Sequence, residues 1–185
     1  IFLAFIGVVL FGLNNAICMP ANGLVAYWKG EGNALDSSGN GHHGTLKYGT
    51  GFDVGKFGQA FKLDGIDDYV YATIYPAISG SDVHMTYAAW VKPEVQSWKS
   101  VITGTLPGSG DSASYQMVVD TSSTTTKGYM NIDGWHNVVS GPITPNAWNH
   151  IAVSYDGNYV YTYVNGALQT TKSESGNFGG FKDAY

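Results

Sequence analysis

The loop of residues 36–44 holds the residue types best suited to binding a metal ion. It reads Asp-Ser-Ser-Gly-Asn-Gly-His-His-Gly. A carboxylate is a hard oxygen ligand, and glycines let backbone carbonyl groups turn toward one point, which is the environment that Ca²⁺ prefers. A turn in which Asp36 and Ser37 hydrogen-bond their own backbone explains the same residues without a metal.

Catalytic chemistry has weaker support in the sequence. Glycoside hydrolysis needs two carboxylates that flank one bond, but the three glutamates, Glu31, Glu94 and Glu174, lie far apart in loop-like segments. A Gly-x-Ser-x-Gly motif is also absent. His42 and His43 are adjacent, so on extended chain they point in opposite directions and make a poor zinc pair. We therefore predict no enzyme, with a glycosidase as the least favoured alternative.

The tryptophans divide into two groups by their surroundings. Trp98 and Trp135 stand among polar residues, and His136 follows Trp135. An exposed indole offers an apolar face to a sugar ring, while polar neighbours bind the hydroxyl groups. We therefore predict Trp98, Trp135 and His136 as ligand-binding residues. The other tryptophans stand in apolar segments and are expected in the core: Trp28, Trp90 and Trp148.

The composition excludes several classes of protein. A hydrophobic content of 44% argues against a disordered chain. The net charge of −5, with no cluster of basic residues, argues against nucleic acid as a partner. Charged residues make up only 12% of the chain, about half the usual share, and 25 glycines fit a protein with many tight turns. One cysteine, Cys18, allows no internal disulfide.

The first 13 residues form an uncharged apolar run. Spanning a bilayer takes about 20 residues, so the run is short for a membrane helix. Its length matches the apolar part of a signal peptide, and we predict residues 1–20 as a signal peptide whose start is truncated. A membrane anchor and a buried strand are the alternatives. The signal peptide implies a secreted or cell-surface protein with no membrane span in the mature domain.

The strand pattern is clearest in residues 148–172. Asp156 with Gly157 and Asn165 with Gly166 are the dipeptides that two-residue hairpin turns prefer. Between them, aromatic and β-branched residues alternate, and Tyr159, Tyr161 and Tyr163 share one face of a strand. This pattern predicts a three-stranded antiparallel meander. About eleven short strands and no helix are expected in total, which is typical of a β-sandwich or barrel.

The order of these segments resembles the laminin-G-like, concanavalin A-like lectin and glucanase family. The resemblance implies an all-β, two-sheet antiparallel jelly-roll sandwich over residues 21–185. Family members usually close with a further strand, whereas this sequence stops at residues 181–185, so we expect the last strand or strands to be missing. The matching blocks are residues 23–28, 36–46, 57–70, 87–93, 148–157 and 164–166.

The resemblance also implies a function. Calcium often occupies the matching loop in the family, which assigns Asp36 a carboxylate ligand, Asn40 an amide oxygen and Asp64 a further ligand. Members are exported binding modules, often attached to glycosidases or adhesins. We therefore predict a non-catalytic, carbohydrate-binding, calcium-supported module of a larger secreted or cell-surface protein. The alternative is a structural or adhesion domain that contacts a surface protein and no sugar.

Overall fold

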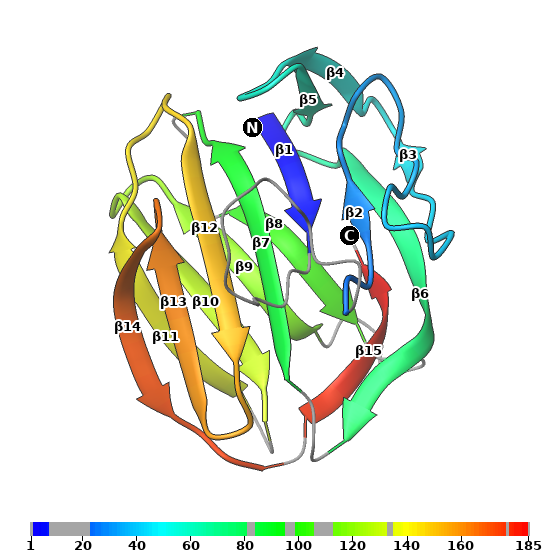
Figure 1. Ribbon diagram of the computed structural model, residues 1–185. Helices are drawn as coiled ribbons and strands as arrows, with labels where there is room; N and C mark the ends of the chain where they lie inside the picture. The colour runs from blue at the N-terminus through cyan, green and yellow to red at the C-terminus, as the bar shows by residue number, and fades with distance from the viewer. Residues whose placement is uncertain are drawn as a thin grey trace, which may run out of the picture.

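Two antiparallel sheets lie face to face (Figure 1). The computed structural model describes residues 2–7, 23–80, 84–94, 99–105, 113–132, 135–176 and 178–184. The strands of the first sheet are β1 (Phe2–Gly7), β2 (Tyr27–Trp28), β4 (Gly51–Val54), β5 (Gln59–Lys62), β7 (Met85–Lys92), β12 (Asn149–Tyr155), β13 (Tyr159–Val164) and β14 (Ala167–Ser173). They follow the order β14-β13-β12-β7-β1-β5-β4, and β2 pairs with β1.

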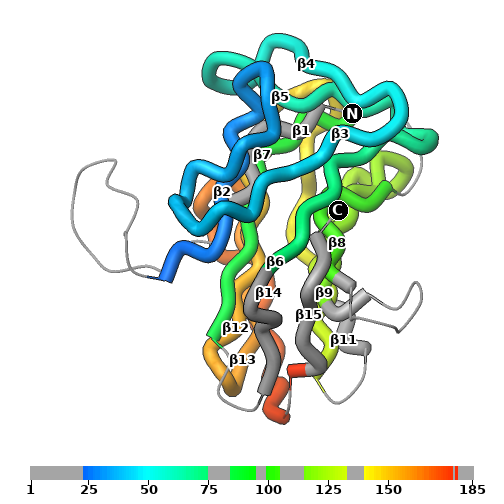
Figure 2. Tube along the Cα trace, turned by 90° about the vertical axis from the view of Figure 1, so that its right-hand side faces the viewer, coloured from blue at the N-terminus to red at the C-terminus, as the bar shows by residue number. Residues whose placement is uncertain are grey.

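The second sheet follows the order β11-β10-β9-β8-β15-β6-β3. Figure 2 shows the two layers side by side, with β12 and β13 in one and β8, β9 and β11 in the other. The described residues contain no helix, and thus none that would cross a membrane. The strands of this sheet are β3 (Thr45–Lys47), β6 (Tyr69–Gly80), β8 (Lys99–Thr105), β9 (Ala113–Asp120), β10 (Thr125–Asn131), β11 (Trp135–Pro142) and β15 (Phe178–Ala184).

The core lies between the two sheets and is built by alternation along the strands. Successive side chains of a strand point to opposite faces, so every second residue of β7 points inward. Tyr87 is the largest of these and is fully buried. Its ring lies 4.8 Å from that of Tyr115, and its hydroxyl donates to the carbonyl oxygen of Tyr129 at 2.8 Å. Tyr87 thus ties the first sheet to β9 and β10 of the second.

The predicted meander is confirmed as β12, β13 and β14. Gly157 lies at φ 91° in the first turn, where the Asp156 amide donates to the Tyr159 carbonyl oxygen at 3.2 Å. Asn165 and Gly166 form the second turn with φ of 51° and 81°, as hairpin turns of this kind require. The predicted all-β sandwich is confirmed as well.

The segment at the start of the chain is part of the first sheet. β1 lies between β7 and β5 and is antiparallel to both, with Leu3 opposite Val91 and Phe61. Residues 8–22 are outside the described part of the chain. A leader removed after residue 20 is a matter of processing, which the fold does not test, so the division into residues 1–20 and 21–185 stays a prediction. The expected loss of a closing strand stays a prediction too.

Two buried threonines allow a matched test of the core. Thr162 and Thr126 are both fully buried. The Thr162 hydroxyl has no hydrogen-bond partner among the described residues, whereas the Thr126 hydroxyl donates to the Val118 carbonyl oxygen at 2.7 Å. An unpaired buried hydroxyl costs free energy, and a paired one contributes.

We expect Thr162→Val to raise the free energy of unfolding by about 1 kcal/mol, because valine keeps the shape and removes the unpaired hydroxyl. Thr126→Val is the control and should lower the free energy of unfolding by about 1 kcal/mol, because it leaves a buried carbonyl without this donor. Urea unfolding of both variants measures the two changes. Equal destabilisation by both would contradict the assignment at Thr162.

Candidate functional site

The side of the first sheet that faces away from the core carries a regular set of residues, which we name the outer face. Strand register places them in rows: Trp90 opposite His150, Ala88 opposite Ala152, and Thr86 opposite Ser154. The next strand, β13, extends two of these rows with tyrosines. The outer face comprises Thr86, Ala88, Trp90, His150, Ala152, Ser154, Tyr161 and Tyr163.

One end of the outer face is an aromatic corner made of Lys56, Phe57, Trp90 and His150. The Trp90 ring lies 5.2 Å from the His150 ring, and the Phe57 ring meets it edge-on at 6.2 Å and 86°. The Lys56 ammonium lies 5.1 Å from the centre of the Trp90 ring. Phe57 is 63% exposed and Trp90 is half-buried. Aromatic area at this corner is therefore open to a ligand.

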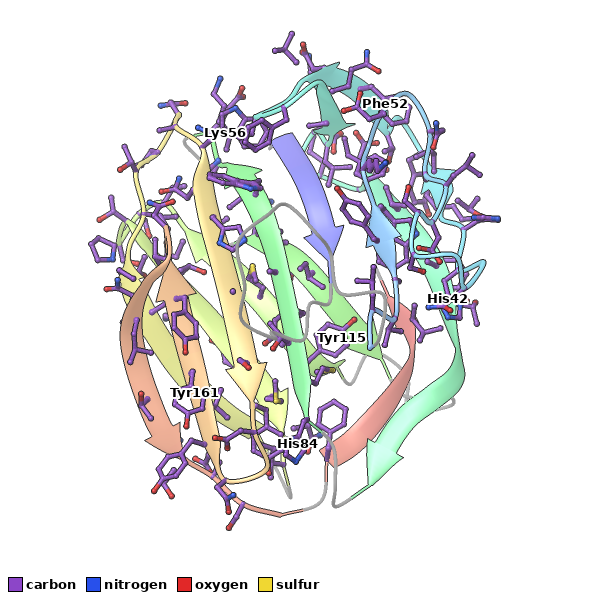
Figure 3. The ribbon with its side chains drawn as sticks, viewed as in Figure 1. His42, Phe52, Lys56, His84, Tyr115 and Tyr161 are labelled. Atoms are coloured by element: carbon purple, nitrogen blue, oxygen red, sulfur yellow. The ribbon has the colours of Figure 1, made fainter. Side chains whose placement is uncertain are left out.

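The middle of the outer face consists of small side chains and two hydroxyl groups. Ala88 and Ala152 form its floor, and the hydroxyl groups of Thr86 and Ser154 are 2.8 Å apart. Figure 3 shows Lys56 and Tyr161 toward opposite ends of this face. Thr86, Ala88 and Ala152 are each at most 9% exposed, so the exposed area of this face lies at its ends.

The titratable groups His150 and Tyr161 of the outer face are both neutral at pH 7. Burial lowers the pKa of His150 below its usual range, so its imidazole is neutral and packs against Trp90 without repelling Lys56. The Tyr161 hydroxyl donates to a carboxylate oxygen of Asp156 at 2.8 Å, and this hydrogen bond raises the pKa of Tyr161. Hydrogen bonding therefore holds the Tyr161 ring in place at the far end.

Both carboxylate oxygens of Asp36, a predicted metal ligand, accept hydrogen bonds. One carboxylate oxygen accepts the amides of Tyr27 at 2.9 Å and Ser38 at 2.8 Å. The other accepts the Ser38 hydroxyl at 2.7 Å and the His42 amide at 3.0 Å. A carboxylate has about four lone-pair positions, and all four are taken. These hydrogen bonds close the loop around the carboxylate, and the role of Asp36 as a calcium ligand stays a prediction.

Asn40 and Asp64 lie in different settings. The Asn40 amide nitrogen donates to the carbonyl oxygens of Leu24 and Val25 at 2.7 and 2.9 Å, which ties the loop to the preceding segment. Carboxylate oxygens of Asp64, Asp67 and Asp68 lie within 4.8 Å of one another in an exposed turn. No hydrogen bond joins Asp64 to Asp36 within the described residues. The role of Asp64 as a metal ligand stays a prediction.

The structure describes the backbone of two of the three predicted ligand-binding residues. Trp98 lies outside the described residues. Trp135 and His136 begin β11, where they pair with Asn131 and Met130 in the second sheet. The side chains of Trp135 and His136 are outside the described part of the structure. Their roles as ligand-binding residues therefore stay predictions.

Sequence reasoning missed the aromatic corner. Trp90 was expected in the core because its block, Tyr-Ala-Ala-Trp-Val, is apolar throughout. The structure places it opposite His150 on the outer face, since Tyr87, Ala89 and Val91 take the inward positions. Trp28 is buried as expected, and its indole nitrogen donates to the His42 carbonyl oxygen at 2.7 Å. Trp148 is half-buried.

Two antiparallel sheets with this order of segments define a jelly-roll sandwich. The chain belongs to the concanavalin A-like lectin/glucanases superfamily, whose family model matches residues 64–184. Among solved structures, it is similar to domain 4 of AbnA, a GH43 extracellular arabinanase from Geobacillus stearothermophilus, in complex with arabinotriose. That likeness has a TM-score of 0.62 and 19% identity, and it covers 86% of this chain and 81% of that one.

A second solved structure is the carbohydrate-binding module CBM66 from Bacillus subtilis. It has a TM-score of 0.46 and 16% identity, over 77% of this chain and 86% of that one. No curated protein matches the sequence. The likeness to the arabinanase domain shows a shared fold.

We expect Asp36→Asn to lower the free energy of unfolding by about 2–3 kcal/mol at pH 7, because an amide replaces two accepting positions with donors. Burial acts to raise the pKa of Asp36, but hydrogen bonds from Ser38, Tyr27 and His42 outweigh it and lower the pKa. The stability that Asp36 contributes is therefore present above about pH 4 and is lost as the pH falls below that.

Urea unfolding of the wild type and of Asp36→Asn between pH 7 and pH 3 measures the stability that the Asp36 carboxylate contributes. The gap between wild type and Asp36→Asn should narrow as the pH falls below about 4. Asp67→Asn, in an exposed turn, is the control and should change the free energy of unfolding by less than about 0.5 kcal/mol. A gap that stays constant with pH would contradict the role of the Asp36 carboxylate.

Proposed function

We propose that this chain is a non-catalytic carbohydrate-binding module whose ligand lies on the outer face, against the aromatic corner. The observation that carries the proposal is the half-buried Trp90 beside the exposed Phe57, next to a floor of Ala88 and Ala152. Aromatic rings bind the apolar face of a sugar, and hydroxyl groups nearby bind its polar edge. This face supplies both in one place.

The likeness to a domain solved with arabinotriose supports a sugar as the ligand. It does so at the level of fold, because the two chains share only 19% of their residues. Functions differ widely among proteins of one fold, so the aromatic corner carries the argument for this chain.

The same residues support binding without catalysis. Cleavage of a glycosidic bond uses two carboxylates about 5 to 9.5 Å apart. None of the residues that define the outer face is acidic, and the neighbouring Asp156 accepts a hydrogen bond from Tyr161. An attached catalytic domain is the natural place for hydrolysis, which is why we propose an accessory module of a larger protein.

Export is part of the proposal. The apolar run at the start of the chain supports it, and the structurally similar arabinanase is extracellular by name. The fold adds one requirement. A mature protein cleaved after residue 20 lacks β1, and its first sheet then needs another strand between β5 and β7.

We expect Phe57→Ala and Trp90→Ala each to weaken binding of an oligosaccharide by at least about tenfold, because each removes aromatic area at the corner. A glycan array followed by calorimetry on the best ligand measures this. Leu46→Ala is the control, since Leu46 is exposed and lies in β3 of the second sheet. It should leave the affinity unchanged.

Circular dichroism checks that each variant is folded. Retained affinity in both aromatic variants would move the site away from the corner, and Trp98, Trp135 and His136 would be tested next. If the folded wild-type protein binds no glycan on the array, the carbohydrate proposal fails. The structural or adhesion domain that contacts a surface protein then takes its place.

We further propose that calcium supports this module at the turn of Asp64, Asp67 and Asp68. Three carboxylates within 4.8 Å of one another repel, and a cation relieves that repulsion. Asp64 accepts the Ile66 amide at 2.8 Å, a hydrogen bond that lowers its pKa and keeps it ionised. Asp64 is the member of the predicted metal set that lies in this turn, and the roles of Asp36 and Asn40 as ligands stay predictions.

We expect 5 mM Ca²⁺ to raise the midpoint of thermal unfolding relative to EDTA, because a ligand that binds only the folded state stabilises it. Asp67→Asn should abolish the rise, since it removes one of the three charges. Asp36→Asn should lower the midpoint in both conditions and keep the rise. A rise that survives Asp67→Asn, or no rise in the wild type, would overturn the calcium site.

A further inference from the structure

We propose that the glycan bound at the aromatic corner carries an anionic group, a carboxylate or a sulfate ester, and that Lys56 selects it. The proposal rests on the carbohydrate-binding function above and names the class of glycan. It starts from the one cation that lies over the ring of Trp90 in the described structure.

The Lys56 ammonium lies where a sugar would stack. It is 5.1 Å from the centre of the Trp90 ring, over its face, and the side chain is exposed. Figure 3 shows Lys56 at the end of β7, above the outer face. No carboxylate pairs with Lys56 within the described residues. A ligand that stacks on Trp90 must therefore move this ammonium aside.

Displacing Lys56 affects neutral and anionic sugars differently. An exposed cation–π contact favours its bound arrangement by about two- to fivefold. A neutral sugar loses that factor and gains nothing from the displaced ammonium. An anionic sugar recovers this loss of affinity, because the displaced ammonium at the rim of the ring then pairs with the carboxylate or sulfate. The lysine over the indole thus acts against neutral ligands and in favour of acidic ones.

Other charged residues lie at the same end of the sheet. Lys62 and Lys92 both lie opposite Phe2 in the strand register, at the same end of the sheet as Trp90. The carboxylate of Asp53 is held by the Lys62 ammonium at 3.1 Å. A hydrogen bond from the Val54 amide, and then Lys62 and Lys92, lowers the pKa of Asp53.

The other carboxylate near the corner is also occupied. Glu31 accepts the Gln59 amide at 3.1 and 3.2 Å with its two oxygens. Asp53 is thus paired with a lysine, whereas Glu31 accepts from the backbone alone and keeps its charge. The preference for an anion therefore rests on Lys56, the cation over the Trp90 ring.

Calorimetry with matched polymers tests the proposal. Oligomers of galacturonate and their methyl esters differ only in charge, and dextran sulfate and dextran provide the same comparison for sulfate. We expect the anionic member of at least one pair to bind about five times more tightly than its neutral partner in 50 mM salt, and the difference to shrink in 500 mM salt. Neutral arabinan serves as a ligand without charge.

Lys56→Gln should remove the preference for the anionic member and leave binding of the neutral member equal or slightly stronger. Lys47→Gln, in β3 of the second sheet, is the charge-matched control and should keep the preference. Both lysines are on the surface, and urea unfolding checks that each variant is as stable as the wild type.

The outcomes separate the two proposals. Equal affinity for charged and neutral members of both pairs overturns the anionic ligand and leaves the carbohydrate-binding function standing. A preference that survives Lys56→Gln overturns the role of Lys56. No binding to any of these polymers, to arabinan or to the glycan array overturns both proposals.

Discussion

The ladder between β7 and β12 is the constraint on which both the core and the outer face depend. Its register places Ala88 opposite Ala152 and Trp90 opposite His150, and it sends Tyr87 into the core. Because side chains alternate, a slip of one residue would bury Trp90 and expose Val91. Packing of the inward residues thus holds the outward residues in place. Trp90 and His150 are thus fixed by the sheet, and the turn between β4 and β5 adds Lys56 and Phe57 to the corner.

The fold could be predicted from the sequence to a large extent, because its signals are local. The dipeptides at Asp156 and Asn165 set two turns by their own backbone preferences, and the strands between them alternate clearly, as β13 shows. The place of β1 could not be predicted in this way. An apolar run has the same composition in a signal peptide and in a central strand, and its partners in β5 and β7 are distant in the sequence.

The candidate site was harder to predict because its signals are not local. Trp90 stands between Ala89 and Val91 in the apolar middle of its strand, and the polar residues of the same face, Thr86 and Lys92, stand near the two ends. Its partner His150 marks the outward face, but it lies 60 residues later. Asp36 carries the residue type of a metal ligand, yet its function depends on donors such as the Tyr27 amide, which the folded loop brings to it. A carboxylate surrounded by donors and one surrounded by other carboxylates look alike in a sequence.

The central place of β1 in the sheet has a consequence for biosynthesis. Leu3 is opposite Val91, so in a chain that keeps residues 1–20, β1 pairs with a strand made 88 residues later. At about 5–20 residues per second, β1 waits about 4–18 s for that partner. Pairing between such distant segments is slow to form. The nascent chain therefore carries an apolar strand with open edges for seconds, and chaperones have that interval in which to bind it.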